Sequence, residues 1–535
     1  MYVCVAGEAA LHRKGVMQST ANVQQTKSIS VSSVVGIIFN YIEYHPVRSL
    51  LAWLVLVSGV RLALATSHDG YLGVDGGAYL LSLNSYWGGD TTNASFERPP
   101  LAPAYLLLPF MAILKGSLGF NTYMAVFSMS LIPSFFFLSR KILGVRFAAI
   151  ATVGISLDWA LSEMFVTGVV PITGFGFMAL LLYGMMGLAE ENTWKYRLII
   201  IGSIPMIAFT NQTALGLSLV TVPIAWLMLD KKLPMLMMLS VGAAASLTAL
   251  PWYIDVLPTQ PRVSYDGPLI YLNYWWSSQW LQLLFAITVA YSIFYIFRSE
   301  KIGARRNERL IATLLIVHGI LNVFLSNDEA IMNIFYRSSY WISVPFVIGC
   351  AILLKEANAR YLAPNFMRIR YPILSLLAVI ALVALGSYGS IFQFYGQAYY
   401  SNLAGRDVLN ALDSIPADEI TRVGTNAESR GFYIAALTKK PVVWVQSATP
   451  AESYIEQEAR ARCELGWRED CSGTGYVSHW LIDTTETQQI KALLSMAPNP
   501  EDAFGNLGEH APWLERTFVQ NNVEVWTYVT EETEK

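Results

Sequence analysis

A series of long apolar runs fills most of the first 391 residues, and it limits what this chain can fold into. A helix needs about 20 mostly apolar residues to cross the hydrocarbon core of a bilayer. Only 14% of the residues are charged, whereas soluble proteins carry about 25%. The sequence therefore predicts an all-α polytopic membrane bundle of about eleven transmembrane helices. The predicted spans lie near 48–66, 121–138, 146–160, 167–188, 197–210, 213–229, 235–250, 278–297, 310–326, 340–354 and 371–391.

A further apolar stretch, 101–114, is short and contains Pro103 and Pro109. Charge placement decides whether it crosses, because Lys and Arg concentrate in cytoplasmic loops. If it does not cross and the N-terminus is cytoplasmic, cytoplasmic segments hold 20 Lys and Arg residues and the outer loops of the bundle hold four. If it crosses, this asymmetry reverses. We therefore expect 101–114 to lie along the membrane or to re-enter it.

The segments on either side of the transmembrane region, 48–395, differ in character. Residues 1–47 lack the early apolar core of a cleavable signal peptide, so we expect a cytoplasmic segment and a first span that acts as an uncleaved signal anchor. Residues 396–535 hold 11 Lys and Arg against 21 Asp and Glu. Their β-like runs and helix-like stretches predict a soluble extracytoplasmic α/β domain. The β-like runs are Arg422–Asn426, Pro441–Gln446, Val477–Thr484 and Val523–Val529, and the helix-like stretches lie near 449–462 and 485–496.

The cysteines and the net charge limit the partners. Cys463 and Cys471 both fall in the predicted outer domain, on the oxidising side, where a disulfide between them and two free thiols both remain open. The four cysteines show no metal-binding spacing. A net charge of −3 gives no electrostatic reason to expect a nucleic-acid partner. The apolar runs predict an integral protein of the cell membrane, so we expect membrane lipid to be a partner.

The first outer loop, 67–120, carries the main candidate for chemistry. Asp75 is followed by apolar residues that share one helical face, namely Tyr79, Leu80, Leu83, Tyr86 and Trp87. Such a helix lies in the membrane interface and would hold Asp75 at the boundary between water and lipid. A carboxylate there can act as a general base on a substrate at the membrane surface, although a solvated loop carboxylate is the simpler reading.

The later outer loops add further polar candidates. Asp158 and Glu163 lie in the second loop and could instead cap helix ends. Arg262 lies among the aromatic residues of the third loop, 251–277, which also suit an interfacial belt. Arg337 is the basic residue at the edge of the fourth loop, where it can clamp a phosphate or act as a snorkelling anchor. Arg61, inside the first span, is expected to face the protein interior or to snorkel.

Several short motifs occur in an order found in one enzyme superfamily. Val74-Asp75-Gly76-Gly77-Ala78-Tyr79 comes early in the first outer loop, and Arg98-Pro99-Pro100-Leu101 opens its short apolar helix. The basic, glycine-containing run 139–144 ends a span, Tyr336-Arg337 precedes a proline-containing span, and the outer domain ends in VEVWTYV. In this layout the chain resembles the C-type superfamily of glycosyltransferases, which includes protein O-mannosyltransferases, aminoarabinose transferases and oligosaccharyltransferases.

The resemblance implies transfer of a sugar from a polyprenyl-phosphate donor to a protein, lipid or glycan acceptor at the outer face of the membrane, with inversion at the anomeric carbon. By it, Asp75 is the catalytic base and Arg337 holds the lipid phosphate. The further substrate-binding residues that it suggests are Arg98, Asp158, Glu163, Arg262 and Tyr336.

The chain also departs from the superfamily pattern in three places. Asp75 is followed by Gly76, where family members often have a second acidic residue. Asp158 and Glu163 lack the close pairing that holds a divalent metal in oligosaccharyltransferases, so the use of Mg²⁺ or Mn²⁺ stays open. Arg98 stands where a histidine often precedes Pro-Pro-Leu, and it suits a phosphate or acceptor contact.

Three other classes of protein compete with this interpretation. A multi-spanning secondary transporter is the main one, yet transporters show internal repeats and charges near the bilayer centre. Here the polar residues gather in outer loops and no repeat is visible. The others are a polysaccharide polymerase or ligase, and a non-catalytic membrane scaffold whose outer domain binds a partner.

Overall fold

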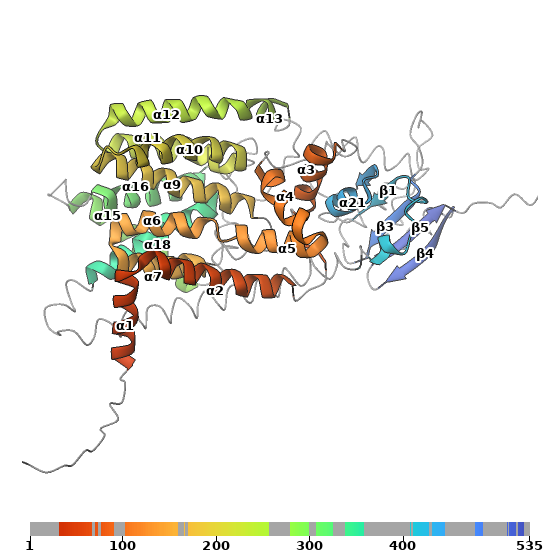
Figure 1. The fold of residues 1–535 in the computed structure, drawn as a ribbon, viewed down its shortest axis with the longest axis horizontal. Helices are drawn as coiled ribbons and strands as arrows, with labels where there is room; N and C mark the ends of the chain where they lie inside the picture. Colours follow the sequence, from red (N-terminus) through yellow and green to blue (C-terminus); the bar gives the residue numbers. More distant parts are fainter. Residues whose placement is uncertain are drawn as a thin grey trace, which may run out of the picture.

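The computed structural model shows a bundle of long helices with a small mixed sheet at one end (Figure 1). We call this end of the bundle the sheet end and the opposite one the far end. The structure describes residues 31–66, 70–72, 76–89, 102–158, 165, 169–255, 279–298, 306–324, 338–357, 407, 410–426, 431–444, 477–484, 511, 513–520 and 523–528.

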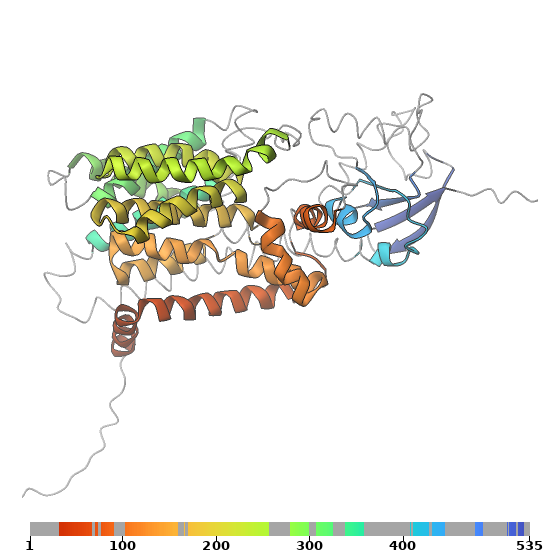
Figure 2. The ribbon, with the colours of Figure 1, turned by 45° about the horizontal axis from the view of Figure 1, so that its top comes forward.

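The long helices run side by side in Figures 1 and 2. They are α2 (Pro46–Thr66), α6 (Leu131–Leu143), α7 (Val145–Ser156), α9 (Val170–Glu190), α10 (Trp194–Thr210), α11 (Gln212–Met228), α12 (Lys232–Ser246), α15 (Gln279–Arg298), α16 (Arg306–Phe324) and α18 (Ser338–Ala357). After α12, the short helices η2 (Leu247–Ala249) and α13 (Leu250–Asp255) follow. A common core of apolar side chains from α6, α7, α9, α10, α11, α16 and α18 holds this bundle together.

Local sequence explains how the chain reverses between neighbouring helices. Gly144 separates α6 from α7 with a φ of 80°, a conformation that glycine adopts without steric cost. Asn211 separates α10 from α11, and its side chain accepts a hydrogen bond from the main-chain N–H of Ala214 at 3.0 Å. This bond satisfies one of the free donors at the start of α11.

The helices overlap the predicted spans. Within the described residues, four helical stretches are long and apolar enough to cross a membrane: Pro46–Thr66, Gly116–Leu143, Val170–Glu190 and Lys232–Ala249. Helices α7, α10, α11, α15, α16 and α18 coincide with six further predicted spans. The predicted span 371–391 lies outside the described residues, so the total of about eleven stays a prediction.

Three shorter helices occupy the sheet end: α3 (Gly76–Gly88), α4 (Ala102–Leu114) and α5 (Gly116–Phe127). Helix α4 forms the ambiguous stretch 101–114, and it is inclined to the long helices in both views (Figures 1 and 2). Whether this stretch crosses the membrane stays a prediction. At the far end, α1 (Val31–Tyr44) lies across the direction of α2; the sequence did not predict this helix.

The C-terminal unit, the described part of residues 407–528, contains helix α21 (Gly431–Thr438) and a five-stranded sheet of order β2-β1-β3-β5-β4. The strands are β1 (Val423–Thr425), β2 (Val442–Trp444), β3 (His479–Asp483), β4 (Leu514–Gln520) and β5 (Val523–Tyr528). Strand β1 pairs in parallel with β2 and β3, whereas β5 pairs antiparallel with β3 and β4. Each of the four predicted β-like runs contains one of these strands, and the boundary at 396 stays a prediction.

One continuous apolar core joins the C-terminal unit to the bundle. Its members come from α2, α3, α5, α21 and the sheet, among other segments, and they include Ala65, Ala78, Phe120, Val423, Ile434, Leu481 and Val525. Because α21 packs on α3, the unit is fixed to the sheet end by shared hydrophobic burial.

Candidate functional site

The predicted site residues fall mostly outside the part of the chain that the structure describes. Asp158 is described. Asp75, Arg98, Glu163, Arg262, Tyr336 and Arg337 lie outside it, as do Cys463 and Cys471. Their roles and the disulfide stay predictions. Described chain neighbours of several of these residues lie at the sheet end, where we therefore consider the candidate site.

Asn121 of α5 fixes the segment that leads to Asp75. Its side-chain oxygen accepts a hydrogen bond from the main-chain N–H of Leu72 at 2.8 Å. Its side-chain nitrogen donates to the carbonyl oxygens of Ala65 at 3.1 Å and Gly70 at 3.0 Å. Asn121 is only 2% exposed, so these bonds satisfy polar groups that water does not reach. Asn121 thereby ties Ala65, Gly70 and Leu72 to α5.

Tyr433 of α21 fixes the same segment from the side of the C-terminal unit. Its hydroxyl donates to the carbonyl oxygen of Leu72 at 3.1 Å. Its ring lies against those of Tyr71 and Phe120, with centroids 5.6 and 6.4 Å away. Burial raises the pKa of the Tyr71 hydroxyl above its ordinary value, which keeps this group neutral.

Gly76, directly after Asp75, allows this close approach. A Cβ atom there would lie 2.1 Å from the Tyr433 hydroxyl oxygen and 2.6 Å from the Phe120 Cζ atom. The first turn of α3 therefore packs against both rings because residue 76 carries no side chain. Both described neighbours of the segment 73–75, Leu72 and Gly76, are in contact with Tyr433.

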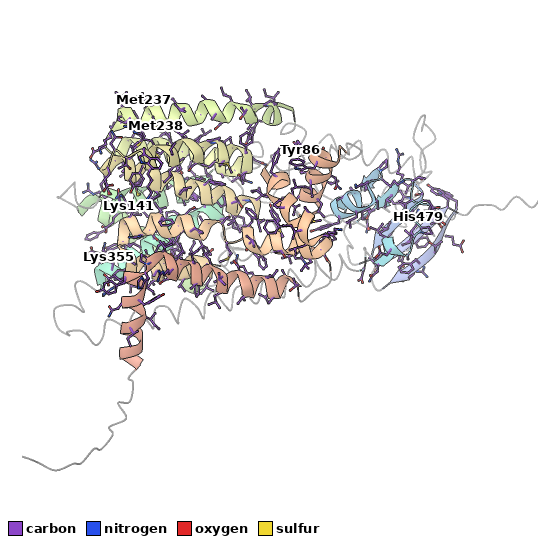
Figure 3. The ribbon with its side chains drawn as sticks, in the orientation of Figure 1. Tyr86, Lys141, Met237, Met238, Lys355 and His479 are labelled. Atoms are coloured by element: carbon purple, nitrogen blue, oxygen red, sulfur yellow. The ribbon has the colours of Figure 1, made fainter. Side chains whose placement is uncertain are left out.

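Helix α3 forms as the sequence predicted. All residues from Gly76 to Leu83 are buried, and the side-chain amide of Asn84 donates to the carbonyl oxygen of Ala436 in α21 at 2.7 Å. Helix α21 packs on α3, a contact that the amphipathic pattern did not predict, and the predicted position of α3 in the membrane interface stays a prediction. Tyr86, seen at α3 in Figure 3, and Trp87 remain exposed, at 38% and 52%.

The second acidic loop starts at the same end. Asp158 is partly buried, and its carboxylate accepts a hydrogen bond from the hydroxyl of Ser343 in α18 at 3.1 Å. Helix α18 begins directly after Arg337, so this bond links Asp158 to the helix that the predicted phosphate clamp precedes. Phe165, two residues after Glu163, belongs to the same core as Leu72 and Ala78. Flanks of Asp75 and Glu163 thus meet in one core.

Arg61 of α2 contacts residues on both sides of the second acidic loop, Ser156 and Phe165. The guanidinium is 6% exposed and donates to the carbonyl oxygens of Ser128 and Ser156, each at 3.2 Å. It also lies over the ring of Phe165, 5.2 Å from the centroid. Of the two expectations for Arg61, the interior position is therefore the one observed. No group of three metal-ligating side chains occurs among the described residues, and the predicted metal stays open.

A separate open groove of about 770 Å³ lies within the C-terminal unit. Glu419, His479, Thr517 and Tyr528 line it together with several apolar residues. The hydroxyl of Ser478 is 3.0 Å from the Nδ1 atom of His479. Burial lowers the pKa of His479, although the charge of Glu419 acts in the opposite direction. This groove offers hydrogen-bonding groups to a polar ligand.

Sequence reasoning missed Asn121, Asn84 and Tyr433. Asn121 stood at the edge of the predicted span 121–138, where a buried amide next to an outer loop is a usable signal. Asn84 falls within the predicted helix but is not among the apolar residues that the pattern singled out. Tyr433 lies 361 residues from its partner Leu72, and nothing in its local sequence indicates that contact.

Comparison with known proteins identifies the fold. No protein-family model matches the chain, and no curated protein matches it. The crystal structure of ArnT from Cupriavidus metallidurans bound to undecaprenyl phosphate is similar at a TM-score of 0.55 and 13% identity, over 91% of this chain and 98% of ArnT. The same protein in the apo state gives a TM-score of 0.53 and 13% identity, over 89% of this chain and 98% of ArnT.

A second similar protein is the arabinofuranosyltransferase AftD from Mycobacteria, seen by cryo-electron microscopy. It has a TM-score of 0.54 and 14% identity, over 89% of this chain and 40% of AftD. At these identities the likeness concerns the fold. The chain therefore shares the overall fold of ArnT and AftD.

Proposed function

We propose that this chain is a membrane glycosyltransferase that moves a sugar from a polyprenyl-phosphate donor to a hydroxyl-bearing acceptor at the outer face of the membrane. The observation that carries the proposal is the shared fold with ArnT, which was crystallised with undecaprenyl phosphate. The position of the motifs supports it, because the flanks of Asp75, Asp158 and the start of α18 all lie at the sheet end.

In the proposed mechanism, Asp75 accepts the proton of the acceptor hydroxyl while the hydroxyl oxygen attacks the anomeric carbon. The bond between that carbon and the phosphate oxygen breaks, and the phosphate leaves with the electron pair. Arg337 stabilises the phosphate charge. Arg98, Arg262 and Tyr336 contact the donor or the acceptor. The acceptor is a protein, a lipid or a glycan.

Asp158 and Glu163 complete the polar surface in this proposal. Either carboxylate can orient sugar hydroxyls by accepting their hydrogen bonds. A divalent metal, Mg²⁺ or Mn²⁺, would need oxygen ligands of this kind. Dialysis against EDTA, followed by assays with and without added Mn²⁺, tests whether a metal takes part.

The arrangement of charges supports an orientation with the N-terminus in the cytoplasm and the C-terminal unit outside. The Lys and Arg residues predicted to be cytoplasmic include Lys141 and Lys355, which Figure 3 places at the far end, away from His479 of the C-terminal unit. Arg146 and Arg306 form ion pairs with Glu43 and Asp230 at helix ends on the same side. This grouping is the one that the positive-inside rule requires.

The test is a transfer assay with the purified full chain in lipid nanodiscs. The protein is incubated with radiolabelled polyprenyl-phosphate sugars and a panel of acceptors, and the wild type is compared with Asp75→Asn. We expect release of the sugar by the wild type and a loss of about 1,000-fold or more in the variant, since general-base catalysis contributes about 10²–10⁴-fold.

Asp69→Asn is the matched control, because it removes another carboxylate from the same loop. It should retain the wild-type rate. Binding of the labelled lipid should survive in Asp75→Asn and weaken in Arg337→Ala. If the wild type neither binds nor cleaves any such lipid, the proposal fails, and vesicle uptake assays then test the transporter interpretation.

A further inference from the structure

The C-terminal unit contacts residues 70–72, the described segment that precedes the proposed base Asp75. Leu72 has both of its main-chain polar groups held, and the two partners come from different parts of the chain. Asn121 of the bundle binds its N–H group, and Tyr433 of the C-terminal unit binds its carbonyl oxygen. Tyr433 also contacts Gly76, the residue after Asp75.

Asn121 is suited to this task by its chemistry. The N–H group of Leu72 can only donate, so the side-chain oxygen of Asn121 faces it and the nitrogen faces the carbonyl groups of Ala65 and Gly70. Both amide hydrogens and the amide oxygen are then used. An aspartate would turn an oxygen toward two carbonyl oxygens, and a leucine would satisfy none of these groups.

We infer that Asn121 and Tyr433 are positioning residues for Asp75, and that the C-terminal unit contributes to catalysis through the Tyr433 hydroxyl. This inference rests on the proposed function, in which Asp75 is the base. Asp75 is the chain neighbour of Gly76 and follows Leu72 by three positions. Since consecutive Cα atoms lie about 3.8 Å apart, a displacement of Leu72 or Gly76 is expected to displace the proposed base. Displacing a reacting group by about 1 Å lowers the rate by about 100-fold.

The kinetic experiment compares Tyr433→Phe with two controls in the transfer assay. The variant removes one oxygen atom and keeps the ring against Tyr71 and Phe120. We expect kcat to fall about 10- to 100-fold, while KM for the lipid donor stays within about twofold, because Tyr433 does not bind the donor. Size-exclusion profile and thermal midpoint check that the variant is folded.

The controls separate positioning from general loosening. Tyr123→Phe removes a hydroxyl from the same aromatic cluster, 6.2 Å between ring centroids from Phe120, and should keep kcat within about twofold. Asn84→Ala removes the hydrogen bond from α3 to the Ala436 carbonyl oxygen of α21 and changes no contact of Leu72 or Gly76 with Tyr433. Its kcat should fall much less than that of Tyr433→Phe. An equal fall in both would mean that the interface as a whole matters, and would overturn the inference.

A second readout does not depend on enzymatic activity. In a chain whose four native cysteines are replaced by serine, Asp75→Cys introduces a thiol whose reaction rate with a charged maleimide reports the accessibility of position 75. Adding Tyr433→Phe should raise this labelling rate about tenfold, because the carbonyl oxygen of Leu72 loses its hydrogen bond from the Tyr433 hydroxyl. Adding Tyr123→Phe should leave the rate unchanged.

The two readouts distinguish the possible failures. Faster labelling together with lower kcat supports the inference. Faster labelling with unchanged kcat, or unchanged labelling, overturns it. If Asp75→Asn keeps the wild-type transfer rate, it is the proposed base that fails, and the labelling result still decides whether Tyr433 holds the segment.

Discussion

The two ends of the helix bundle are held together by different kinds of interaction. At the far end, ion pairs join neighbouring helices, as in Lys141–Glu190 at 2.7 Å and Lys355–Glu308 at 3.1 Å. Glu190 also accepts a hydrogen bond from Asn307 at 3.0 Å. At the sheet end, the bonds that fix Leu72 and α3 come from the neutral side chains of Asn121, Asn84 and Tyr433.

The difference reflects what each end has to do. Flexible charged side chains near water bind in many geometries, and each pair stabilises the fold only slightly. A buried neutral hydrogen bond is directional, and losing one partner leaves a polar group without water. We therefore expect substitutions to cost less stability at the far end than at the sheet end, where Asn121 and Tyr433 hold the main chain at Leu72.

The same substitution made at each end tests this comparison most strongly. Asn121→Asp places a carboxylate against the carbonyl oxygens of Ala65 and Gly70 in a buried site, which should cost about 3 kcal/mol or more. Asn307→Asp is the counterpart at the far end, where Lys141 lies close to the same Glu190 carboxylate. It should change the stability by less than about 1 kcal/mol.

Thermal unfolding in detergent, followed by tryptophan fluorescence, measures both effects. Transfer activity should also disappear in Asn121→Asp and persist in Asn307→Asp. Equal losses of stability in the two variants would show that the two ends do not differ in the way described.

Gly76→Ala is expected to have the next largest effect. The added Cβ atom would lie 2.1 Å from the Tyr433 hydroxyl oxygen and 2.6 Å from the Phe120 ring, so one of them must move. Overpacking of this kind costs about 1–3 kcal/mol. Gly59→Ala in α2 is the control, because no atom lies within 4 Å of its added Cβ. It should be neutral or stabilise the helix by up to about 1 kcal/mol.

At the far end, the largest loss should come from Lys355→Met. The Glu308 side chain is only 10% exposed and accepts a hydrogen bond from the Lys355 ammonium group at 3.1 Å. Removing this ammonium group should therefore lower the free energy of unfolding by about 1–2 kcal/mol. The loss should shrink in high salt, which screens the pair in the wild type. Lys195→Met, which removes an ammonium lying over the Tyr183 and Tyr196 rings, should cost about 0.5 kcal/mol. A larger loss at Lys195 would contradict this ranking.

The sequence predicted the far end better than the sheet end. Apolar runs and charge placement are local patterns, and they were enough to locate most helices and to group the basic residues on one side. The sequence did not predict helix α1. Its apolar side chains Ile37 and Tyr41 are exposed at 66% and 52%. Its 14 residues are too few for the length that identified the spans.

The sheet end depends on contacts between distant parts of the chain. The sequence pointed to Asp75 and to the helix after it, and both expectations used only neighbouring residues. The bond between Tyr433 and Leu72, the packing of α21 on α3 and the link from Ser343 to Asp158 join residues far apart in sequence. A single sequence shows no periodicity or composition that selects such pairs, so they required the folded structure.

The weakest expected effect belongs to the ion pair of Asp230 and Arg306 at the far end. A hydrogen bond from Arg306 lowers the pKa of Asp230 below its ordinary value of 3.8, opposed by burial and aided by the charges of Arg306, Lys231 and Lys232. A lowered carboxylate pKa stabilises the fold above the ordinary pKa and loses this effect as the pH falls through the folded-state value.

The thermal midpoint of the wild type should therefore exceed that of Asp230→Asn slightly at pH 6, and the two should converge as the pH falls below about 4. High salt at pH 6 should remove most of the difference, since the pair lies at the surface. A difference that grew toward low pH would mean that Asp230 is protonated in the fold. The far end would then contain a buried acid, and the contrast between the two ends of the bundle would lose its basis.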